Sequence, residues 1–235
     1  VVAAATVVSA GRASSNDDDK KVVVKMLSES MCPNCQDFLQ DEVKPAFSAE
    51  GIWGITDFQY IPWGNAYTDT AECPNKVAGR YNAATRQCWN ALCGSPDAPA
   101  SCWDLSKQIC QHGAAECRGD RYESCAIALA GGRPQRWYDF VMCFMVDHSG
   151  SLAYVTPCAQ EAGLNTDLLE RCAAEGNVFG DRLERRMINE TNAVGAHTGV
   201  PWVLVNGKQV TENLLAEICN AYTGEKPAGC SKVAA

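Results

Sequence analysis

The chain of 235 residues contains 14 cysteines, and this number limits its folding environment more than any other feature of the sequence. Cysteine-rich chains fold where disulfides persist, whereas cytosolic proteins keep few cysteines and hold them reduced. An apolar content of 46% is sufficient for an ordinary hydrophobic core. We therefore predict a globular protein of an oxidising compartment, in which disulfides reinforce a conventional core.

Charge and hydropathy argue against two classes of partner. The net charge of −8 disfavours binding to nucleic-acid backbones and to anionic membrane surfaces. The most apolar run of the folded region, Phe140–Val146, has seven residues, whereas a membrane-spanning helix needs about 20. We expect neither nucleic-acid binding nor a membrane span.

The two ends of the chain differ in composition from the rest. Val1–Ala10 is rich in alanine and valine and closes with the small residues that signal peptidase accepts, and Asn16–Lys21 is a charged run typical of a solvated linker. We predict an N-terminal extension over 1–21, either a signal remnant with a linker or a disordered or tag-derived segment. One domain then covers 22–230, and a tail covers 231–235.

A CxxC motif lies between a predicted strand and a predicted helix. Val22–Leu27 is an apolar run typical of a central strand, and the motif Cys32–Cys35 follows it. Apolar residues then recur at helical spacing up to Val43, where Pro45 is expected to interrupt the helix. By itself CxxC fits a redox pair, a buried structural pair or half of a zinc site.

The strand–CxxC–helix order favours the redox pair. Cys32 would begin the helix, where free N–H groups and the macrodipole stabilise a thiolate, and Pro33 fits the first turn. We predict that Cys32 is an exposed nucleophile whose pKa is lowered by the N–H groups of Asn34 and Cys35. Cys35, one turn further along, would be shielded and would resolve the mixed disulfide.

A second pattern lies near the other end of the chain. Trp202–Val205 is a predicted strand, and Asn206-Gly207 is typical of a type I′ hairpin turn. Asn213–Tyr222 is a predicted helix with one apolar face. Taken alone, Pro201 is expected to be a trans residue at the strand start, because few X-Pro bonds are cis.

Together these two patterns resemble the thioredoxin fold. The resemblance implies that the Val200–Pro201 bond is cis and faces the CxxC motif, and that the main chain at Val200 pairs with an extended substrate. Pro33, Asn34, Val200 and Pro201 are the residues expected to contact substrate. Pro201 follows Cys35 by 166 positions, so we predict an α/β thioredoxin-like fold with a large Cys-rich, partly helical insertion over approximately 64–195.

The insertion is expected to combine short elements with helices. The stretch from Gly64 to Cys125 holds seven cysteines, Cys125 included, and no long apolar pattern. Elements there should be short and cross-linked, and the pairing of the cysteines is left open. Further on, three helices are predicted: one with an apolar stripe over Trp137–Met145, one over Asp167–Ala174, and one over Arg182–Thr191 with Asp181 as its cap.

The stretch Cys110–Cys117, CQHGAAEC, followed by Cys125, is similar to the signature CQHGxxECxxNxxxxC of gamma-interferon-inducible lysosomal thiol reductases. Asp120 stands where the family has Asn. The resemblance implies a reductase of acidic endosomes and lysosomes. Cys110, His112, Cys117 and Cys125 are also a conceivable zinc set, but an oxidising compartment favours disulfides. For Gln111, His112 and Glu116 we expect structural roles.

The predicted function is the reduction of protein disulfides by Cys32 and Cys35, with unfolded or extended chains as substrates and a small thiol or dithiol as reductant. No cofactor or metal is expected, and the predicted location is secretory or endolysosomal. The alternatives are a secretory-pathway oxidase or isomerase, and a non-catalytic structural or binding subunit. Asn189 begins the only N-x-S/T triplet and is a candidate glycosylation site.

Overall fold

A computed structural model describes residues 21–75, 77 and 79–232. The predicted signal remnant lies outside the described residues, as does most of the predicted linker. The main sheet has the order β2-β1-β5-β6, and a second sheet pairs β3 with β4. The strands are β1 (Val22–Ser28), β2 (Thr56–Pro62), β3 (Tyr67–Thr68), β4 (Gln108–Ile109), β5 (Trp202–Val205) and β6 (Lys208–Val210).

The two ends of the chain meet in this sheet. Strand β1 is parallel to β2 and antiparallel to β5, with Met26 opposite both Tyr60 and Val203. Asn206 and Gly207 have φ values of 47° and 84°, which the predicted type I′ hairpin between β5 and β6 requires. The Val200–Pro201 bond before β5 is cis, as the resemblance to thioredoxin implied. The predicted α/β fold is thus confirmed.

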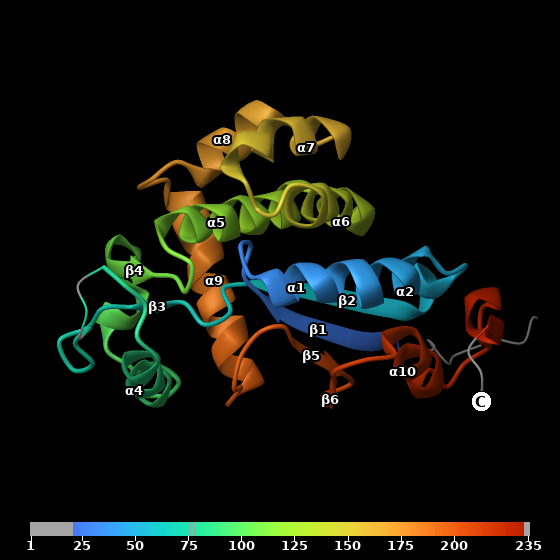
Figure 1. Ribbon diagram of the computed structural model, residues 1–235, viewed down its shortest axis with the longest axis horizontal. Coiled ribbons are helices and arrows are strands. Elements are labelled where there is room, and N and C mark those ends of the chain that lie inside the picture. The colour runs from blue at the N-terminus through green and yellow to red at the C-terminus, as the bar shows by residue number, and fades with distance from the viewer. Residues whose placement is uncertain (1–20, 76, 78, 233–235) are drawn as a thin grey trace, which may run out of the picture.

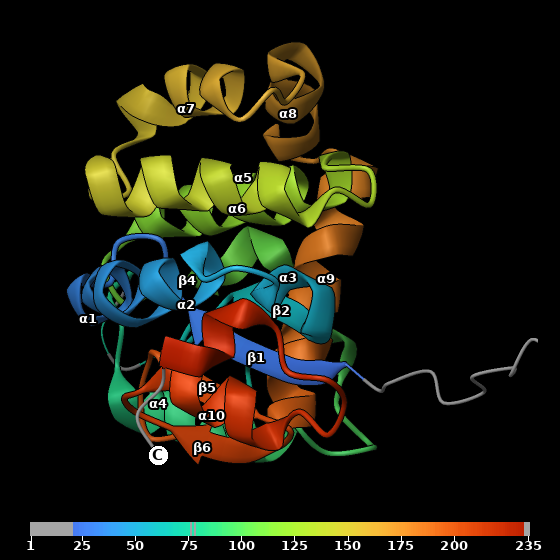
Figure 2. The ribbon, with the colours of Figure 1, turned by 90° about the vertical axis from the view of Figure 1, so that its right-hand side faces the viewer.

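Helices cover both faces of the sheet. They are α1 (Pro33–Phe38), α2 (Lys44–Ser48), α3 (Ile52–Ile55), α4 (Ala83–Cys93), α5 (Ala114–Leu129), α6 (Pro134–Val141), α7 (Val155–Glu161), α8 (Thr166–Ala173), α9 (Val178–Val194) and α10 (Leu214–Ala221). One face of β1, carrying Val24 and Met26, packs in the larger core with residues of α1, α2 and α10. The other face, carrying Leu27, packs with Trp89 of α4 and Ile188 of α9. Figures 1 and 2 show α7 and α8 as an outer layer over α5 and α6, which lie over α1 and α2.

The helix after the CxxC motif does not stop at Pro45, so that prediction was wrong. A π-helical turn over Leu39–Val43 joins α1 to α2, and the N–H of Lys44 bonds to the carbonyl of Leu39. Proline has no N–H and its ring collides with the carbonyl four residues back in an ordinary α-helix. The wider π turn directly before Pro45 lets the helical path continue to Ser48.

The insertion is more helical than its sequence indicates. Helix α5 has 16 residues, whereas we predicted only short elements here. The helix was missed because Glu116, Asp120 and Glu123 occupy positions on its buried face, so no apolar stripe marks it in the sequence. The predicted helices at α6 and α8 are confirmed. Helix α9 starts earlier than predicted, since its cap is Asn177 and not Asp181.

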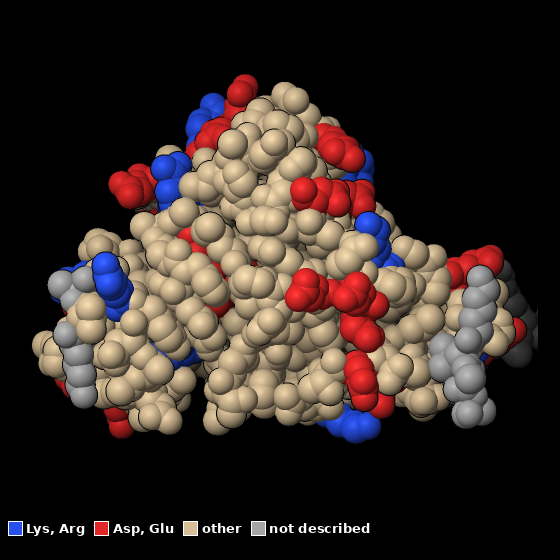
Figure 3. Space-filling view, in the orientation of Figure 1, with Lys and Arg blue, Asp and Glu red and all other residues tan. Residues whose placement is uncertain are grey.

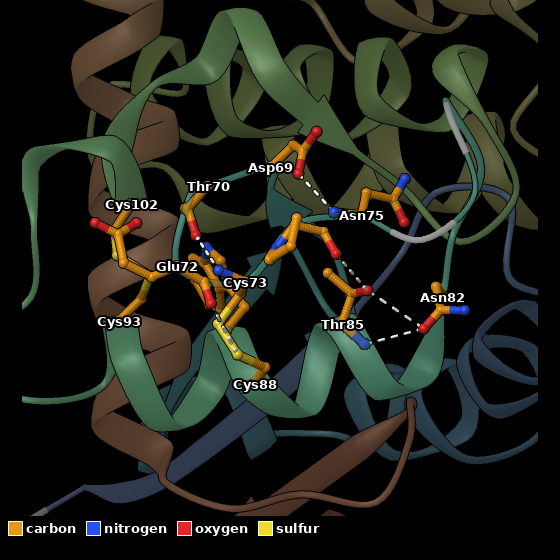
Figure 4. Close-up of a disulfide and its surroundings, with 12 residues drawn as sticks. Asp69, Thr70, Glu72, Cys73, Asn75, Asn82, Thr85, Cys88, Cys93 and Cys102 are labelled. Atoms are coloured by element: carbon orange, nitrogen blue, oxygen red, sulfur yellow. Dashed lines mark hydrogen bonds between the residues drawn. A yellow bond between two sulfur atoms is a disulfide. The ribbon is translucent and has the colours of Figure 1, made fainter.

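Disulfides tie these elements together. In the described part of the chain, which holds all 14 cysteines, Cys32 and Cys35 are free. The six disulfides are Cys73–Cys88, Cys93–Cys102, Cys110–Cys117, Cys125–Cys172, Cys143–Cys158 and Cys219–Cys230. Figure 4 shows two of them at α4, whose first turn is capped by the Asn82 side chain accepting from the N–H of Thr85 at 3.0 Å. Cross-links therefore fix the region where apolar patterning is weakest.

The surface reflects the acidic composition. On the face shown in Figure 3, acidic side chains gather right of centre, over α1, α2 and α10, and basic side chains lie mainly toward the edges. Within the described ranges, none of the helices combines the length and the apolar character needed to cross a bilayer.

Candidate functional site

Cys32 and Cys35 lie at the start of α1, as predicted. Cys32 is the N-cap residue, and its Sγ accepts a hydrogen bond from the N–H of Cys35 at 3.3 Å. Of the two amides predicted to bond this sulfur, Cys35 does so, and the hydrogen bonds of the described residues include none from Asn34. One N–H of the helix start, that of Cys35, is thus directed at the sulfur of Cys32.

Cys32 is less accessible than we predicted. It is only 4% exposed and Cys35 is fully buried, whereas Pro33 and Asn34 between them are exposed. The reason is the segment before β5: the thiol of Cys32 lies 3.8 Å from the carbonyl oxygen of Val200, 168 residues away. The prediction of an exposed Cys32 was therefore wrong, while that of a shielded Cys35 is confirmed.

The two thiols have different acidities. Hydrogen bonding from the thiol of Cys35 lowers the pKa of Cys32 to about 7, against the opposing effect of burial. The backbone N–H of Cys35 and the charge of His112 lower it further, whereas Glu116 raises it. Burial raises the pKa of Cys35 well above its ordinary value, and Cys32 adds to this effect. Cys32 is thus the sulfur that ionises first.

The stretch similar to the family signature forms a loop and a helix start beside this pair. The Cys110–Cys117 disulfide closes it, and Gly113 adopts a φ of 98° at the helix start. The backbone N–H of His112 bonds to Oε1 of Glu116 at 2.9 Å, and the imidazole Nδ1 contacts the same carboxylate. The ring also lies 3.7 Å from Oε2 of Glu29. His112 therefore forms part of the site, although we expected only a structural role.

Helix α5 also holds the turn that precedes Cys32. Ser30 donates its N–H to Oδ1 of Asp120 at 2.7 Å and its hydroxyl to the carbonyl of Glu116 at 3.1 Å. Gly119 allows this approach, because a Cβ there would lie 2.3 Å from the Ser30 hydroxyl. On the other side of the loop, Gln111 accepts from the amide of Asn65 at 2.7 Å. The signature-like segment thus clamps the turn that carries Cys32.

Four carboxyl groups are buried beside the cysteine pair: Glu29, Glu116, Asp120 and Glu123 are each at most 1% exposed. Burial raises the pKa of Glu29, Asp120 and Glu123 well above the ordinary value, and the charges of neighbouring carboxylates add to the effect. Glu116, Asp120 and Glu123 recur at i, i+4 and i+7, a spacing that places them on one helix face. That spacing was the sequence signal for the cluster, and it was missed.

Two groups of side chains have the composition of metal sites. Glu29, His112 and Glu116 lie close enough to share an ion, but Nδ1 of His112 is already engaged by Glu116, so we assign them to an ion pair. Cys143 and Cys158 lie near His148 but are bonded to each other. Cys110, Cys117 and Cys125 of the alternative zinc set are likewise in disulfides. They have no thiolate for a metal.

His197 and Asn189 each lie in local contacts. The imidazole of His197 bonds to the carbonyl of Gly195 at 3.2 Å and approaches Arg86 at 3.5 Å. Asn189 is exposed on α9, where its Oδ1 accepts from the indole of Trp103 at 3.2 Å.

Comparison with known proteins gives consistent results. A profile of the family described as gamma interferon inducible lysosomal thiol reductase (GILT) matches residues 23–89 and 98–162. A gamma-interferon-responsive lysosomal thiol protein of Arabidopsis thaliana is 27% identical over 84% of this chain and 69% of its own. The gamma-interferon-inducible lysosomal thiol reductase of Carassius auratus is 27% identical over 89% of this chain and 72% of its own. The enzyme of the same name from Mus musculus is 26% identical over 90% of this chain and 72% of its own.

Two solved structures share the fold. Reduced DsbA from Mycobacterium tuberculosis aligns with a TM-score of 0.53 and 14% identity, covering 92% of this chain and 89% of its own. Reduced DsbG from the same organism aligns with a TM-score of 0.51 and 14% identity, covering 90% of this chain and 84% of its own. This chain thus shares the thioredoxin-like fold of these two proteins.

Proposed function

Because the chain belongs to the gamma-interferon-inducible lysosomal thiol reductase family and is a thiol-disulfide oxidoreductase, we propose that it reduces protein disulfides through Cys32 and Cys35. The observation that carries this proposal is the pairing state of the cysteines. Twelve are in disulfides, and the two that are free lie together at a helix start against the Val200–Pro201 segment.

The asymmetry of the pair supports a different role for each cysteine. The thiolate of Cys32 attacks a substrate disulfide and forms a mixed disulfide, and the first substrate sulfur leaves and takes up a proton. Cys35 then attacks the sulfur of Cys32, which closes the Cys32–Cys35 disulfide and frees the second substrate sulfur. A small thiol or dithiol restores the reduced pair.

The surface around Cys32 suits an extended chain. Val200 is half-buried beside the sulfur, and Pro33 and Asn34, which follow Cys32 in the chain, are exposed. A substrate strand that pairs with the main chain at Val200 passes next to the thiolate, and such pairing reads backbone rather than side chains. We therefore assign substrate contact to Pro33, Asn34, Val200 and Pro201, and unfolded or extended proteins as substrates.

The lowered pKa of Cys32 supports work in an acidic endosomal or lysosomal compartment. With a pKa of about 7, about one molecule in a hundred carries the thiolate at pH ~5, compared with about one in three thousand for an ordinary cysteine. Retaining some thiolate at acid pH is what a reductase of that compartment needs. The six disulfides fit a secretory route.

Two variants test the assignment. Cys32→Ser should abolish the reduction of insulin or of a quenched disulfide peptide. Cys35→Ser should capture one substrate molecule per chain in a mixed disulfide visible by mass spectrometry. Equal turnover by wild type and Cys32→Ser would exclude the mechanism. A reduction potential near −120 mV, that of a strong oxidant, would instead assign the pair to oxidation.

Asn189 is the proposed glycosylation site, because it is exposed on α9. Protein secreted from eukaryotic cells should lose mass on glycosidase treatment, and Asn189→Gln should abolish that loss. An unchanged mass of the wild-type protein would remove the assignment.

A further inference from the structure

Resting on the proposed function, we propose that Arg86 and His197 position the segment 195–200 over Cys32, and that protonation of His197 releases this segment. The 195–200 segment is then closed at neutral pH and loosened in an acidic compartment. In this way a residue of the Cys-rich insertion controls access to the reacting sulfur.

The 195–200 segment covers Cys32. It joins α9 to β5 and ends at the cis bond between Val200 and Pro201 (Figure 1). The carbonyl oxygen of Val200 lies 3.8 Å from Sγ of Cys32, and Cys32 is only 4% exposed. A substrate disulfide has to contact this sulfur, so the access of substrate depends on where the segment lies.

Two glycines give the segment room to move. Gly195 has a φ of 86°, and at both Gly195 and Gly199 the described residues leave the space within 4 Å of an added Cβ empty. Ala196 and Thr198 are exposed, whereas His197 between them is half-buried. His197 is therefore the side chain that fastens the middle of the segment.

The imidazole of His197 is held between α4 and β5. Its Nδ1 lies 3.2 Å from the carbonyl oxygen of Gly195. A carbonyl only accepts, so Nδ1 carries the proton and Nε2 of the neutral ring keeps its lone pair. That lone pair faces Nη2 of Arg86 at 3.5 Å, and a guanidinium only donates. On the other side, the ring centroid lies 6.3 Å from that of Trp202. The neutral imidazole thus suits its surroundings.

Arg86 reaches the opposite side of the site as well. It is 4% exposed on α4, a helix that two disulfides tie to its surroundings (Figure 4). Its Nη2 donates to the carbonyl of Gly64 at 3.0 Å. Gly64 lies directly against Glu29, because a Cβ on Gly64 would come within 2.4 Å of Cγ of Glu29. Glu29 in turn accepts the backbone N–H of Cys32 at 3.1 Å. One guanidinium therefore links the turn before Cys32 to the segment that covers it.

Arg86 is the charged group that faces His197. Burial lowers the pKa of Arg86 to about 10, so the guanidinium is charged throughout the range from acidic to neutral pH. Burial also lowers the pKa of His197, and the charge of Arg86 adds to this effect, while two backbone carbonyls oppose it. These carbonyls belong to Gly195 of the segment itself and to Gly64 of the turn after β2. Trp202 completes the surroundings of the ring.

Acid turns the contact between His197 and Arg86 into repulsion. The added proton binds Nε2, so the ring no longer offers Arg86 an acceptor and competes with it for the Gly64 carbonyl. Two like charges about 3.5 Å apart shift an equilibrium by about sevenfold even at the dielectric constant of water. Because the proton binds an exposed ring more tightly than this one, acid favours the open segment. The change falls below about pH 6.5, the ordinary pKa of histidine.

The first experiment measures the contact itself. The chain has three histidines, so NMR titration of the imidazole C–H signals gives the pKa of each, and the signal lost in His197→Gln identifies His197. Arg86→Met removes the charge and keeps most of the buried volume. The pKa of His197 should rise toward its ordinary value in this variant. An unchanged pKa of His197 in folded Arg86→Met would overturn the proposal.

The second experiment measures access to Cys32. Iodoacetamide alkylation of the reduced protein is followed between about pH 4.5 and 8. Each rate is divided by the thiolate fraction that the measured pKa of Cys32 gives, which removes the influence of His112 and Glu116 on that titration. The corrected rate of the wild type should rise by about threefold to tenfold as His197 is protonated. His148→Gln is the matched control and should show the same rise.

Two substitutions of His197 separate the closed from the open segment. Glutamine offers Arg86 an uncharged acceptor at every pH, so His197→Gln should keep the corrected rate at the neutral wild-type level. His197→Ala removes the contact and should give the raised rate at every pH. An acid rise that persists in His197→Gln, or that is missing from the wild type, would overturn the proposal. If Arg86→Met does not fold, these two variants decide by the same criterion.

The outcome is independent of the proposed function, because neither titration nor alkylation needs a substrate. Failure of Cys32 to capture a disulfide peptide at any pH would refute the proposed function. The pH dependence of access would still decide whether His197 and Arg86 hold the segment.

Discussion

Ser30 donates its backbone N–H to the carboxylate of Asp120 at 2.7 Å, which joins the turn before Cys32 to a helix 90 residues further along the chain. Both residues are buried. The bond needs only an oxygen acceptor, so a neutral carboxylic acid or an amide can make it equally well. An asparagine, which the family signature has at this position, offers the Ser30 N–H the same kind of acceptor through its amide oxygen.

Asp120→Asn should make the free energy of unfolding of the protein less sensitive to rising pH. Burial, followed by the charges of Glu116 and Glu29, raises the pKa of Asp120 well above its ordinary value. The native state then binds more protons than the unfolded state, so the free energy of unfolding falls as pH rises above about 4. Each unit by which the pKa is raised accounts for about 1.4 kcal/mol of that fall. The amide removes this contribution.

Denaturant unfolding with intact disulfides, measured between about pH 4 and 8, checks the prediction. The slope of unfolding free energy against pH should be shallower in Asp120→Asn than in wild type. Exposed Asp97 supplies the control, since Asp97→Asn should leave the slope unchanged. A slope as steep in Asp120→Asn as in wild type would show that Asp120 does not titrate in this range.

His112→Gln should raise the pKa of Cys32. The imidazolium lowers that pKa, and Glu116 opposes it. Removing the imidazole leaves the carboxylate unopposed beside the sulfur, so we expect an increase of about half a unit to one unit, which corresponds to about 0.7 to 1.4 kcal/mol. Thiolate absorbance or the rate of iodoacetamide alkylation, titrated against pH, measures it. His148→Gln, in which the lost ring stacks on Tyr154, should leave the Cys32 titration unchanged. A Cys32 titration in His112→Gln that coincides with the wild type would refute the role of His112.

Much of the sheet could be predicted because its signals are local. The apolar run at Val22, the Asn206-Gly207 turn and the CxxC motif each specify their structure within a few residues. The cis bond before Pro201 was reached only through resemblance, because a single proline carries no sign of its isomer.

The burial of Cys32 and the contacts of the carboxyl cluster were not predicted, because they depend on residues that lie far apart in the sequence. Cys32 is covered by Val200, 168 residues away, and no local pattern reports that burial. Helix α5 buries Glu116 and Asp120 instead of apolar residues, so the periodicity that normally marks a core helix is absent. Burial of these carboxyl groups is acceptable only because Ser30 and His112 bond to them.

Gly150→Ala should displace the turn before Cys32. Gly150 has a φ of 71°, and a Cβ there would lie 2.2 Å from the carbonyl oxygen of Ser30, a backbone atom that cannot rotate away. Left-handed backbone strain costs about 1–2 kcal/mol and overpacking about 1–3 kcal/mol more. Gly163→Ala is the matched control, because its φ is 66° and nothing lies within 4 Å of the added Cβ. In denaturant unfolding, Gly150→Ala should lose more stability than Gly163→Ala. The alkylation rate of Cys32 should change in Gly150→Ala and stay at the wild-type value in Gly163→Ala. Equal losses in both variants would mean that Gly150 is needed for its backbone conformation alone.

Two disulfides should differ in what their removal changes: the longer one mainly affects stability, and the shorter one also affects the reactivity of Cys32. Cys125–Cys172 closes 47 residues, so loop-closure entropy predicts a loss of about 4 kcal/mol when both cysteines become alanine. Cys110–Cys117 closes seven residues, so the same relation predicts a loss of stability of only about 2.4 kcal/mol. The shorter loop, however, contains His112, which contacts Glu29 beside the cysteine pair. Removal of the Cys110–Cys117 disulfide should therefore raise the pKa of Cys32. Removal of the Cys125–Cys172 disulfide should leave that pKa at the wild-type value in the folded protein. Denaturant unfolding and pH-dependent alkylation measure the two effects. A pKa of Cys32 that changes in the Cys125→Ala/Cys172→Ala variant and stays constant in Cys110→Ala/Cys117→Ala would contradict the assignment of the shorter loop to the site.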